Sequence, residues 1–272
     1  MNPMDVDRSF TGSIPQLYEQ LLVPLIFAPY ADDLARRAAA LRPASVLELA
    51  AGTGVVTRAL ARALPVETGI VASDLNQPML DHAATIGTAR PVRWQQADAL
   101  ELPFADSAFD LVVCQFGVMF FADKPRAFAE ARRVLRNGGT LLFSAWDRIE
   151  VNELAHEVSL ALETLFPADP PRFMARTPHG YYDRARIAAD LAQGGFASAM
   201  QLDTVAARSI AASAREPAVA YCQGTPWRNE IEARSPPGLN AATQCASEAI
   251  ERRFGNGRID AAIQAHVVAI VK

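Results

Sequence analysis

The sequence contains few cysteines and few histidines. Its three cysteines, Cys114, Cys222 and Cys245, lie far apart without a C-x-x-C pair, and its four histidines are isolated from one another. An odd number of widely spaced thiols is typical of a reducing compartment and argues against a disulfide framework. Neither residue type supplies ligands at the short spacing that a metal site uses. We therefore expect no metal, and we expect Cys114, inside an apolar run, to be buried.

The sequence also lacks a basic excess and long apolar runs. Its 272 residues include 26 Lys and Arg against 30 Asp and Glu, whereas proteins that bind a phosphate backbone usually carry a basic patch. No apolar run reaches the roughly 18 residues that cross a bilayer, and the first residues, "MNPMDVDRSF", lack a signal pattern. We therefore expect a cytoplasmic protein without nucleic-acid or membrane partners. A homodimer is compatible with the sequence, which does not fix the oligomeric state.

The middle of the chain alternates between strand-like and helix-like segments. Strands are predicted in "SVLELA", "GIVASDL", "PVRWQQADAL", "FDLVVCQFGVMFF" and "TLLFSAW". Helices are predicted in "GTGVVTRALARAL", "NQPMLDHAATIG" and "KPRAFAEARRVLRNGG", the last ending at Asn137 and Gly138. Such alternation predicts an α/β fold with a parallel sheet covered by helices on both faces. Later strands in "ASAMQLDTVAAR" and in "IDAAIQAHVVAIVK", which opens as a short helix or turn, bring the expected total to seven.

The remaining segments predict an N-terminal helical region and a lid. Pro24 and Pro29 are expected to break the first region into two short helices, ahead of an amphipathic helix that Pro43 stops. Two further stretches flank the penultimate strand. One follows Trp146, and the other is an irregular stretch from 210 to 256. We expect the two to pack together as a helical lid. The predicted organisation is a core with N-terminal helices (1–147), a lid insertion (148–182), a core helix and strand (183–209), a second lid segment (210–258) and a final core strand (259–272).

Acidic and small residues follow the predicted strands. Glu48 and the turn "AAGTG" end the first strand, Asp74 ends the second, and Asp98 follows the third. In open parallel sheets, ligands bind outside these carboxyl ends, and an acid after the second strand commonly holds both ribose hydroxyls. Val55 and Val56 fill the helix start where a diphosphate would bind, and no lysine or arginine stands directly beside the turn. The pattern therefore indicates a nucleoside with a positively charged tail that lacks phosphate.

Five motifs in this order resemble those of the class I S-adenosylmethionine-dependent methyltransferases. They are "VLELAAGTG", "VASDLNQPML", "QQADALELPF", "FDLVVCQFGVMFF" and "EARRVLRNGGTLLFSAW", and the resemblance covers about residues 40–147. The group that they resemble is that of the ubiquinone/menaquinone biosynthesis methyltransferases. The resemblance implies a Rossmann-like, seven-stranded, mostly parallel sheet and S-adenosylmethionine as cofactor. It further implies a small-molecule methyl acceptor. Ala50 stands where the family has its first glycine.

The resemblance also implies roles for individual residues. Glu48 orders the turn, Asp74 holds the ribose, and Asp98 accepts from the adenine amino group. The alternatives are a plain helix cap for Asp74 and a plain turn residue for Asp98. The other implied contacts are Leu75 and Met79 against the adenine, Ala99 beside it, Ala50, Gly52, Gly54 and Gln115 at the methionine end, and Tyr18 at the cofactor carboxylate. Core packing is an alternative for Met79.

The lid offers a candidate catalytic base. His179 lies in "TPHGYYD", and a base suits an acceptor that must lose a proton. An exposed loop histidine is an equally compatible interpretation. The lid aromatic and methionine side chains favour a hydrophobic or aromatic acceptor, or else form the core of the lid; they are Phe166, Phe173, Met174, Tyr181, Tyr182 and Trp227. Two alternative functions stay open: S-adenosylmethionine binding without methyl transfer, and a nicotinamide-dependent oxidoreductase.

Overall fold

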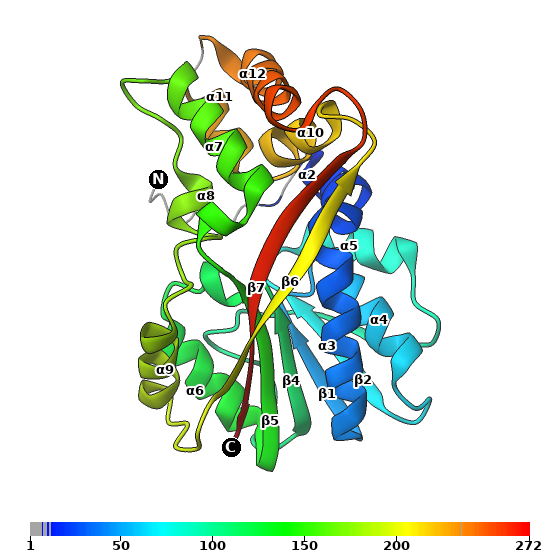
Figure 1. Ribbon diagram of the computed structural model, residues 1–272. Coiled ribbons are helices and arrows are strands. Elements are labelled where there is room, and N and C mark those ends of the chain that lie inside the picture. The colour runs from blue at the N-terminus through cyan, green and yellow to red at the C-terminus, as the bar shows by residue number, and fades with distance from the viewer. Residues whose placement is uncertain (1–6, 8–9, 11, 235) are drawn as a thin grey trace. The chain divides into compact units, whose positions relative to one another are not determined.

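The computed structural model describes residues 7, 10, 12–234 and 236–272 (Figure 1). Most of the stretch in which we expected no signal pattern lies outside these residues. The chain forms two compact units. The first comprises Met1–Phe27, Trp146–Gly180 and Ala206–Ala265, and the second comprises Ala28–Ala145, Tyr181–Val205 and His266–Lys272. Residues up to Phe27 thus share a unit with the segments that we expected to form a lid.

The sheet has seven strands in the order β3-β2-β1-β4-β5-β7-β6, which confirms the predicted α/β class. β1 pairs in parallel with β2 and β4, β2 with β3, and β4 with β5. The chain order reverses between β1 and β4, where ligands bind in folds of this kind. The strand bounds are Ser45–Leu49 (β1), Gly69–Asp74 (β2), Arg93–Gln96 (β3), Phe109–Gln115 (β4), Leu135–Trp146 (β5), Gln201–Ala211 (β6) and Ile259–Val271 (β7).

β7 runs antiparallel to β5. The Asp147 N–H donates to the Gln264 carbonyl at one end, and the Lys272 N–H donates to the Gly139 carbonyl at the other. The expectation that this segment opens as a short helix or turn is wrong, because β7 is extended from Ile259 onward. Its alternating burial along the first residues is the period of a strand with one covered face.

β5 begins earlier than predicted. Helix α6 (Lys124–Val134) ends at Val134, so its predicted end at Asn137 and Gly138 is wrong. Gly138 and Gly139 belong to β5 instead. The Gly138 N–H donates to the carbonyl of Lys272, the residue directly after β7, and this bond extends the pairing between the two strands. The pairing with β4 shifts register between Phe109 and Leu111, which is how a sheet absorbs extra residues.

Helices cover both faces of the sheet in the second unit. α3 (Ala28–Leu41) and α4 (Val55–Ala63) share one buried cluster with Leu142 of β5. Phe143 points to the opposite face and packs against Phe128 of α6, with ring centroids 5.5 Å apart. α9 (Arg184–Gln193) packs beside α6 (Figure 1). α5 (Gln77–Ile86) contributes Leu80 to a smaller cluster with β2.

The helical segment from Ile14 to Leu41 is unbroken, so the predicted break at the two prolines is wrong. α2 (Ile14–Leu17) leads directly into the π-helix η1 (Tyr18–Phe27), and η1 leads into α3. Pro24 lies inside the π-helix, whose wider turn accommodates a ring that would clash in an α-helix. Pro29 lies in the first turn of α3, where a missing N–H costs little.

The first unit is more helical than predicted. The stretch from 210 to 256, expected to be irregular apart from one helix, also contains α10 and α11. The helices of this unit beyond the N-terminal segment are α7 (Glu153–Leu165), α8 (Phe173–Arg176), α10 (Arg215–Gln223), α11 (Trp227–Glu232) and α12 (Gly238–Phe254). The 3-10 turns η2 (Val118–Phe120) and η3 (Ile149–Val151) complete the described elements.

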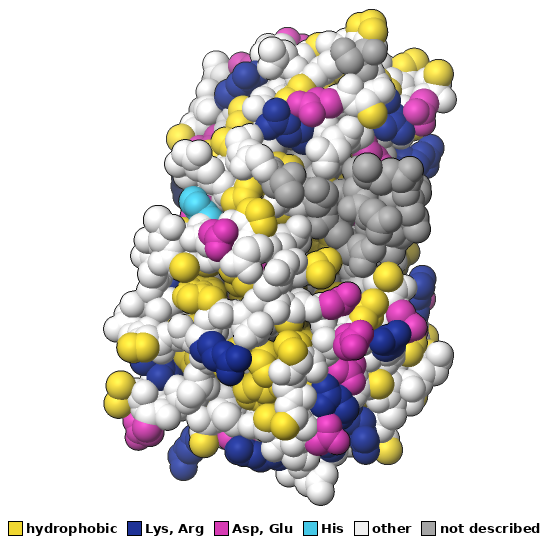
Figure 2. Space-filling model, turned by 180° about the vertical axis from the view of Figure 1, so that it is seen from behind, with side chains coloured by type: hydrophobic (Ala, Val, Ile, Leu, Met, Phe, Trp, Pro, Cys, Tyr) yellow, Lys and Arg dark blue, Asp and Glu magenta, His cyan; other side chains and the backbone are white. Residues whose placement is uncertain are grey.

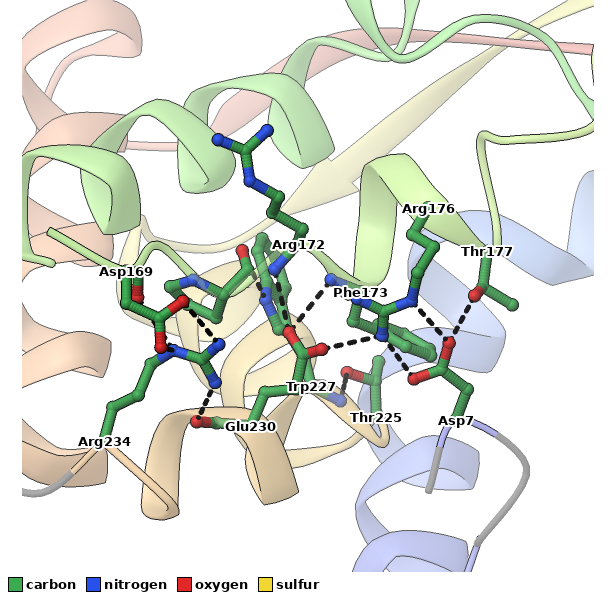
Figure 3. A network of polar contacts seen from close by, with 11 residues as sticks. Asp7, Asp169, Arg172, Phe173, Arg176, Thr177, Thr225, Trp227, Glu230 and Arg234 are labelled. Atoms are coloured by element: carbon green, nitrogen blue, oxygen red, sulfur yellow. Dashed lines mark hydrogen bonds and ion pairs between the residues drawn. The ribbon is translucent and has the colours of Figure 1, made fainter. Parts of the chain in front are cut away.

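A polar network joins α8, α11 and Asp7 within the first unit (Figure 3). Glu230 of α11 accepts from the N–H groups of Arg172 and Phe173, at 2.8 and 3.1 Å, and from Arg176 at 2.7 Å. Arg176 also donates to both carboxylate oxygens of Asp7, which is 1% exposed. A buried carboxylate needs such compensation, so this network fixes the short helix α8 within its unit.

Candidate cofactor-binding site

The turn after β1 has an unusual backbone. Ala50, Gly52 and Gly54 all adopt positive φ, at 52°, 57° and 86°. A side chain at Gly54 would also place its Cβ 3.0 Å from the Trp94 ring and 3.2 Å from the Ala83 Cβ. Position 54 therefore requires glycine for both conformation and space, and the turn brings bare backbone to the edge of the sheet.

Asp74 holds this turn from the end of β2. One carboxylate oxygen accepts from the Gly52 N–H at 2.8 Å, and the other accepts from the Asn76 N–H at 2.8 Å. The side chain is 7% exposed, and burial raises its pKa although the two backbone hydrogen bonds oppose the rise. The oxygen that accepts from Gly52 has a second lone pair, whereas the other oxygen also accepts from the Asn76 side-chain amide at a longer 3.4 Å. The carboxylate can therefore accept from one ligand hydroxyl directly and from a second one in place of that amide.

Glu48 links β1 to α4. It is 1% exposed and accepts from the Thr57 hydroxyl at 2.6 Å. Burial raises the pKa of Glu48 to about 8, the Thr57 hydrogen bond opposes this, and the charge of Asp74 adds to it. Near neutral pH the side chain is therefore mostly protonated and adds little charge beside Asp74.

The other predicted cofactor residues of the second unit lie along the same strand ends. Leu75, directly after Asp74, is 41% exposed. Met79 is 3% exposed on α5, and Gln115 ends β4 beside Ser144 of β5. Asp98 is exposed, and one of its oxygens accepts from the Leu100 N–H at 2.9 Å as in a turn. Ala99, the next residue along the chain from Asp98, is partly buried.

Tyr18 and His179 belong to the first unit and form part of a row of rings there. Tyr18 stacks on Phe27 at 4.9 Å, Phe27 packs against Trp146, and the Trp146 ring lies 6.0 Å from that of His179. His179 is 4% exposed, so the interpretation of an exposed loop histidine is wrong. Burial lowers the pKa of His179 to about 4, which leaves the ring neutral near pH 7.

Most of the predicted aromatic lid residues are core. Trp227 is fully buried and its ring N–H donates to the Pro171 carbonyl at 3.2 Å, while Tyr181 donates to Asp190 at 2.8 Å. Phe166, Phe173 and Met174 are likewise buried, and only Tyr182 of the six is exposed. The five buried side chains therefore belong to the core of the fold, and their apolar character does not indicate the chemistry of the acceptor.

Sequence reasoning missed several contacts at the turn. We expected no lysine or arginine near the turn, and this is wrong. Arg58 of α4 folds back and donates to the Thr53 carbonyl at 2.7 Å. Its position one helical turn after Gly54 could have revealed this. Gly117 was also missed: its ideal Cβ would lie 2.4 Å from the Ala50 Cβ and 2.7 Å from the Cys114 sulfur. Its partner Ala50 is distant in sequence, so no local signal identifies it.

The Gly117→Ala variant is expected to be less stable by about 1–3 kcal/mol, the usual cost of overpacking. The new methyl group must displace the Ala50 side chain, so cofactor binding is expected to weaken as well. Adding Ala50→Gly removes one of the two clashes and is expected to recover part of both losses. Urea unfolding and calorimetric titration of the cofactor measure these effects.

Gly257→Ala is the matched control, because its ideal Cβ meets nothing within 4 Å. Unchanged stability in Gly117→Ala, or no recovery in the double variant, contradicts the proposed packing between positions 50 and 117.

Comparison with known proteins places this geometry in a family. The methyltransferase domain family matches residues 47–143. The ubiquinone/menaquinone biosynthesis C-methyltransferase UbiE of Escherichia coli O139:H28 is 32% identical over 171 residues, 58% of this chain and 68% of that protein. UbiE of Teredinibacter turnerae is 32% identical over 165 residues, 56% of this chain and 66% of that protein, so the match leaves about a third of it uncovered. Phosphoethanolamine N-methyltransferase 2 of Haemonchus contortus, solved with S-adenosylhomocysteine, shares the fold with a TM-score of 0.61 and 15% sequence identity. The alignment covers 98% of this chain and 59% of that one.

The chain belongs to the class I S-adenosylmethionine-dependent methyltransferases. The strand-end geometry fits the cofactor of that family. Asp74 offers a buried carboxylate for a diol, the turn is held against it through the Gly52 N–H, and Leu75 offers an apolar surface beside it. Arg58 donates to the Thr53 carbonyl of the turn at 2.7 Å, so its guanidinium is hydrogen-bonded to the protein backbone at this site.

Within the described parts of the chain, no helix combines the length and the apolar character needed to span a membrane. Across the same residues, no three His, Cys, Asp or Glu side chains group as a metal site requires. Neither result bears on the strand-end site, whose chemistry rests on carboxyl groups and backbone N–H groups.

Proposed function

We propose that this chain transfers the methyl group of S-adenosylmethionine to a small, apolar or aromatic acceptor. The observation that carries the proposal is the buried Asp74 carboxylate, which accepts from the Gly52 N–H at 2.8 Å and can accept from a diol when one hydroxyl replaces the 3.4 Å contact of the Asn76 amide. When bound, the cofactor supplies an electrophilic methyl group on a positively charged sulfur. A site for such a group needs chiefly to align the acceptor and exclude water.

The predicted cofactor contacts stay part of this proposal. Asp74 binds the ribose hydroxyls, and Asp98 accepts from the adenine amino group. Glu48 keeps the turn in place through α4. The remaining proposed contacts are Leu75, Met79 and Ala99 at the adenine, and Ala50, Gly52, Gly54, Gln115 and Tyr18 at the methionine end.

An aromatic, quinone-like acceptor is supported by two observations. Relatives at 32% identity are named for C-methylation in ubiquinone and menaquinone biosynthesis. In the first unit, Tyr18, Phe27, Trp146 and His179 form a continuous row of rings, and flat apolar ligands bind well against such side chains.

His179 is the proposed base. Its Nδ1 contacts the Asp147 carbonyl at 2.8 Å, and a carbonyl can only accept, so Nδ1 carries the proton and the neutral ring keeps its lone pair on Nε2. Nε2 takes a proton from an O–H or C–H of the acceptor, and the electron pair left on the acceptor forms the new bond to the methyl carbon. The S–CH₃ pair stays on sulfur, and the proton later leaves His179 for solvent.

A methyl-transfer screen tests the proposed function. Purified protein with methyl-labelled S-adenosylmethionine is incubated with hydroxylated aromatics, quinols and, as contrast, nucleic acid and peptide. We expect label only in an aromatic small molecule. Binding of the cofactor without transfer to any acceptor would favour the alternative of a binding protein, and tighter binding of NAD would contradict the proposal.

The Asp74→Ala variant is expected to bind S-adenosylmethionine about 5- to 150-fold more weakly, which corresponds to about 1–3 kcal/mol for lost polar contacts in a buried site. Two backbone N–H groups lose their acceptor together with the ribose. Calorimetric titration gives the dissociation constant, and exposed Asp81 on α5 provides the control Asp81→Ala. An unchanged constant in Asp74→Ala would refute the ribose role.

The proposal includes a cytoplasmic location and no nucleic-acid partner. The formal net charge is −4, and on the face shown in Figure 2 basic side chains are interspersed with acidic ones. A phosphate-backbone binder usually gathers its basic residues in one patch. The oligomeric state is to be measured by light scattering, with a homodimer as one outcome.

A further inference from the structure

Asn152 uses its side chain in an unusual way. It stands at the N-cap position of α7, where an asparagine normally accepts from helix N–H groups, but it makes no such cap bond. Its amide nitrogen instead donates to the carbonyls of Asp147, Arg148 and Gln264, at 3.3, 3.1 and 3.2 Å. Its amide oxygen accepts from the Gln264 N–H at 3.1 Å. The residue is 1% exposed, so its buried amide links two backbone segments, Asp147–Arg148 and the part of β7 at Gln264.

One of these carbonyls also contacts His179. The Asp147 carbonyl lies 2.8 Å from Nδ1 of His179 and 3.3 Å from the Asn152 amide nitrogen. A carbonyl oxygen has two lone pairs and cannot donate. Its two partners must therefore both be donors, and His179 must carry its proton on Nδ1.

The Asp147 peptide is fixed from its other sides as well. Its N–H donates to the Gln264 carbonyl at 3.2 Å, and its carboxylate accepts from the Gln264 side chain at 2.7 Å. The charged groups that face His179 are the carboxylates of Asp147 and Glu150, and the Trp146 ring lies 6.0 Å away.

We propose that Asn152 is a positioning residue for His179. By holding the Asp147 carbonyl in place, it keeps the proton on Nδ1 and leaves the Nε2 lone pair for the methyl acceptor. This inference rests on the proposed function, in which His179 is the base. Asn152 itself touches neither acceptor nor cofactor in this role.

The tautomer of His179 tests the inference without an acceptor. In protein labelled with ¹⁵N-histidine, long-range proton–nitrogen spectra distinguish Nδ1–H from Nε2–H, and His179→Gln assigns the signal. We expect Nδ1–H to dominate in the wild-type protein. Two variants remove the amide donors: Asn152→Ala adds no charge, and Asn152→Asp keeps the shape of the side chain. In both variants we expect the ratio of Nδ1–H to Nε2–H to fall about two- to tenfold, as for one lost hydrogen bond.

Asn240→Asp is the matched control, since Asn240 is exposed on α12 of the same unit. Near-UV circular dichroism establishes that each variant is folded, and Asn152→Ala carries the test if the added charge unfolds Asn152→Asp. A proton on Nε2 in the wild-type spectrum overturns the inference at once, whatever the variants do. An unchanged ratio in a folded Asn152 variant also overturns it.

Activity separates this inference from the proposed function. If Asn152 positions the base, kcat is expected to fall in Asn152→Ala while the cofactor dissociation constant stays unchanged. If His179→Gln transfers methyl groups at the wild-type rate, the base assignment fails, although the tautomer result can still hold. A tautomer that shifts without any change in kcat overturns the positioning role alone.

Discussion

Replacing Glu48 by Gln is expected to reduce the loss of stability that we expect for the wild-type protein as the pH rises. Asp74, whose pKa burial also raises, contributes a loss in the same direction in both proteins. Burial raises the pKa of Glu48 from 4.5 to about 8 in the folded chain. Between these values the folded state holds a proton that the unfolded state has released, so the free energy of unfolding falls with pH. For one proton the slope is at most about 1.4 kcal/mol per pH unit. Below pH 4.5 both states are protonated and the effect vanishes.

The measurement is urea unfolding at intervals from pH 5 to 9 for wild type and Glu48→Gln. The glutamine retains an oxygen that accepts from Thr57, and it resembles the protonated acid. His179 acts in the opposite direction between about 4 and 6.5, because burial lowers its pKa. The difference between the two proteins therefore isolates Glu48. Exposed Glu67 supplies the control Glu67→Gln, and identical slopes in wild type and Glu48→Gln would rule out the buried proton.

Removing the base is expected to slow methyl transfer by about 100-fold, near the lower end of what general bases contribute. The low end is appropriate because a pKa of about 4 makes His179 a weak base. The variant is His179→Gln, and the readout is kcat with an acceptor that must lose a proton. The kcat/KM of the wild-type enzyme is expected to rise with pH near 4 and to show no histidine step between 6 and 7.

His156→Gln is the control, since His156 lies on α7 of the same unit and is only partly buried. An equal loss in both variants would indicate a structural effect. A wild-type rate in His179→Gln would remove the base from the mechanism and leave alignment of the acceptor as the main source of catalysis.

The predictions that succeeded rest on local patterns. Alternation of apolar strands and amphipathic helices predicted the seven-stranded sheet, because burial on both faces leaves a clear mark on each strand. The position of Asp74 at the end of the second strand was predictable for the same reason, because β2 ends at Asp74. Cys114 is fully buried, as its apolar run predicted.

The predictions that failed depend on distant partners. The first residues of β5 pair with the end of β7, which lies more than a hundred residues further along the chain, and nothing near Gly138 indicates this. Pro24 predicts a break only if the helix keeps α geometry, whereas the segment changes to a π-helix. Asn152 looks like an ordinary helix cap in sequence, and its role emerges only when Asp147 and Gln264 are brought beside it.

The contact between Ala50 and Gly117 has a consequence for protein engineering. The methyl group of Ala50 occupies the volume that a side chain at 117 would need, so the residue tolerated at one position depends on the residue at the other. Grafting the first strand–turn segment of a glycine-containing relative into this chain leaves an unfilled space beside position 117. Transferring the Ala50 turn into a relative with a side chain at that place introduces a clash. Chimeras in this family therefore need to exchange the two segments together.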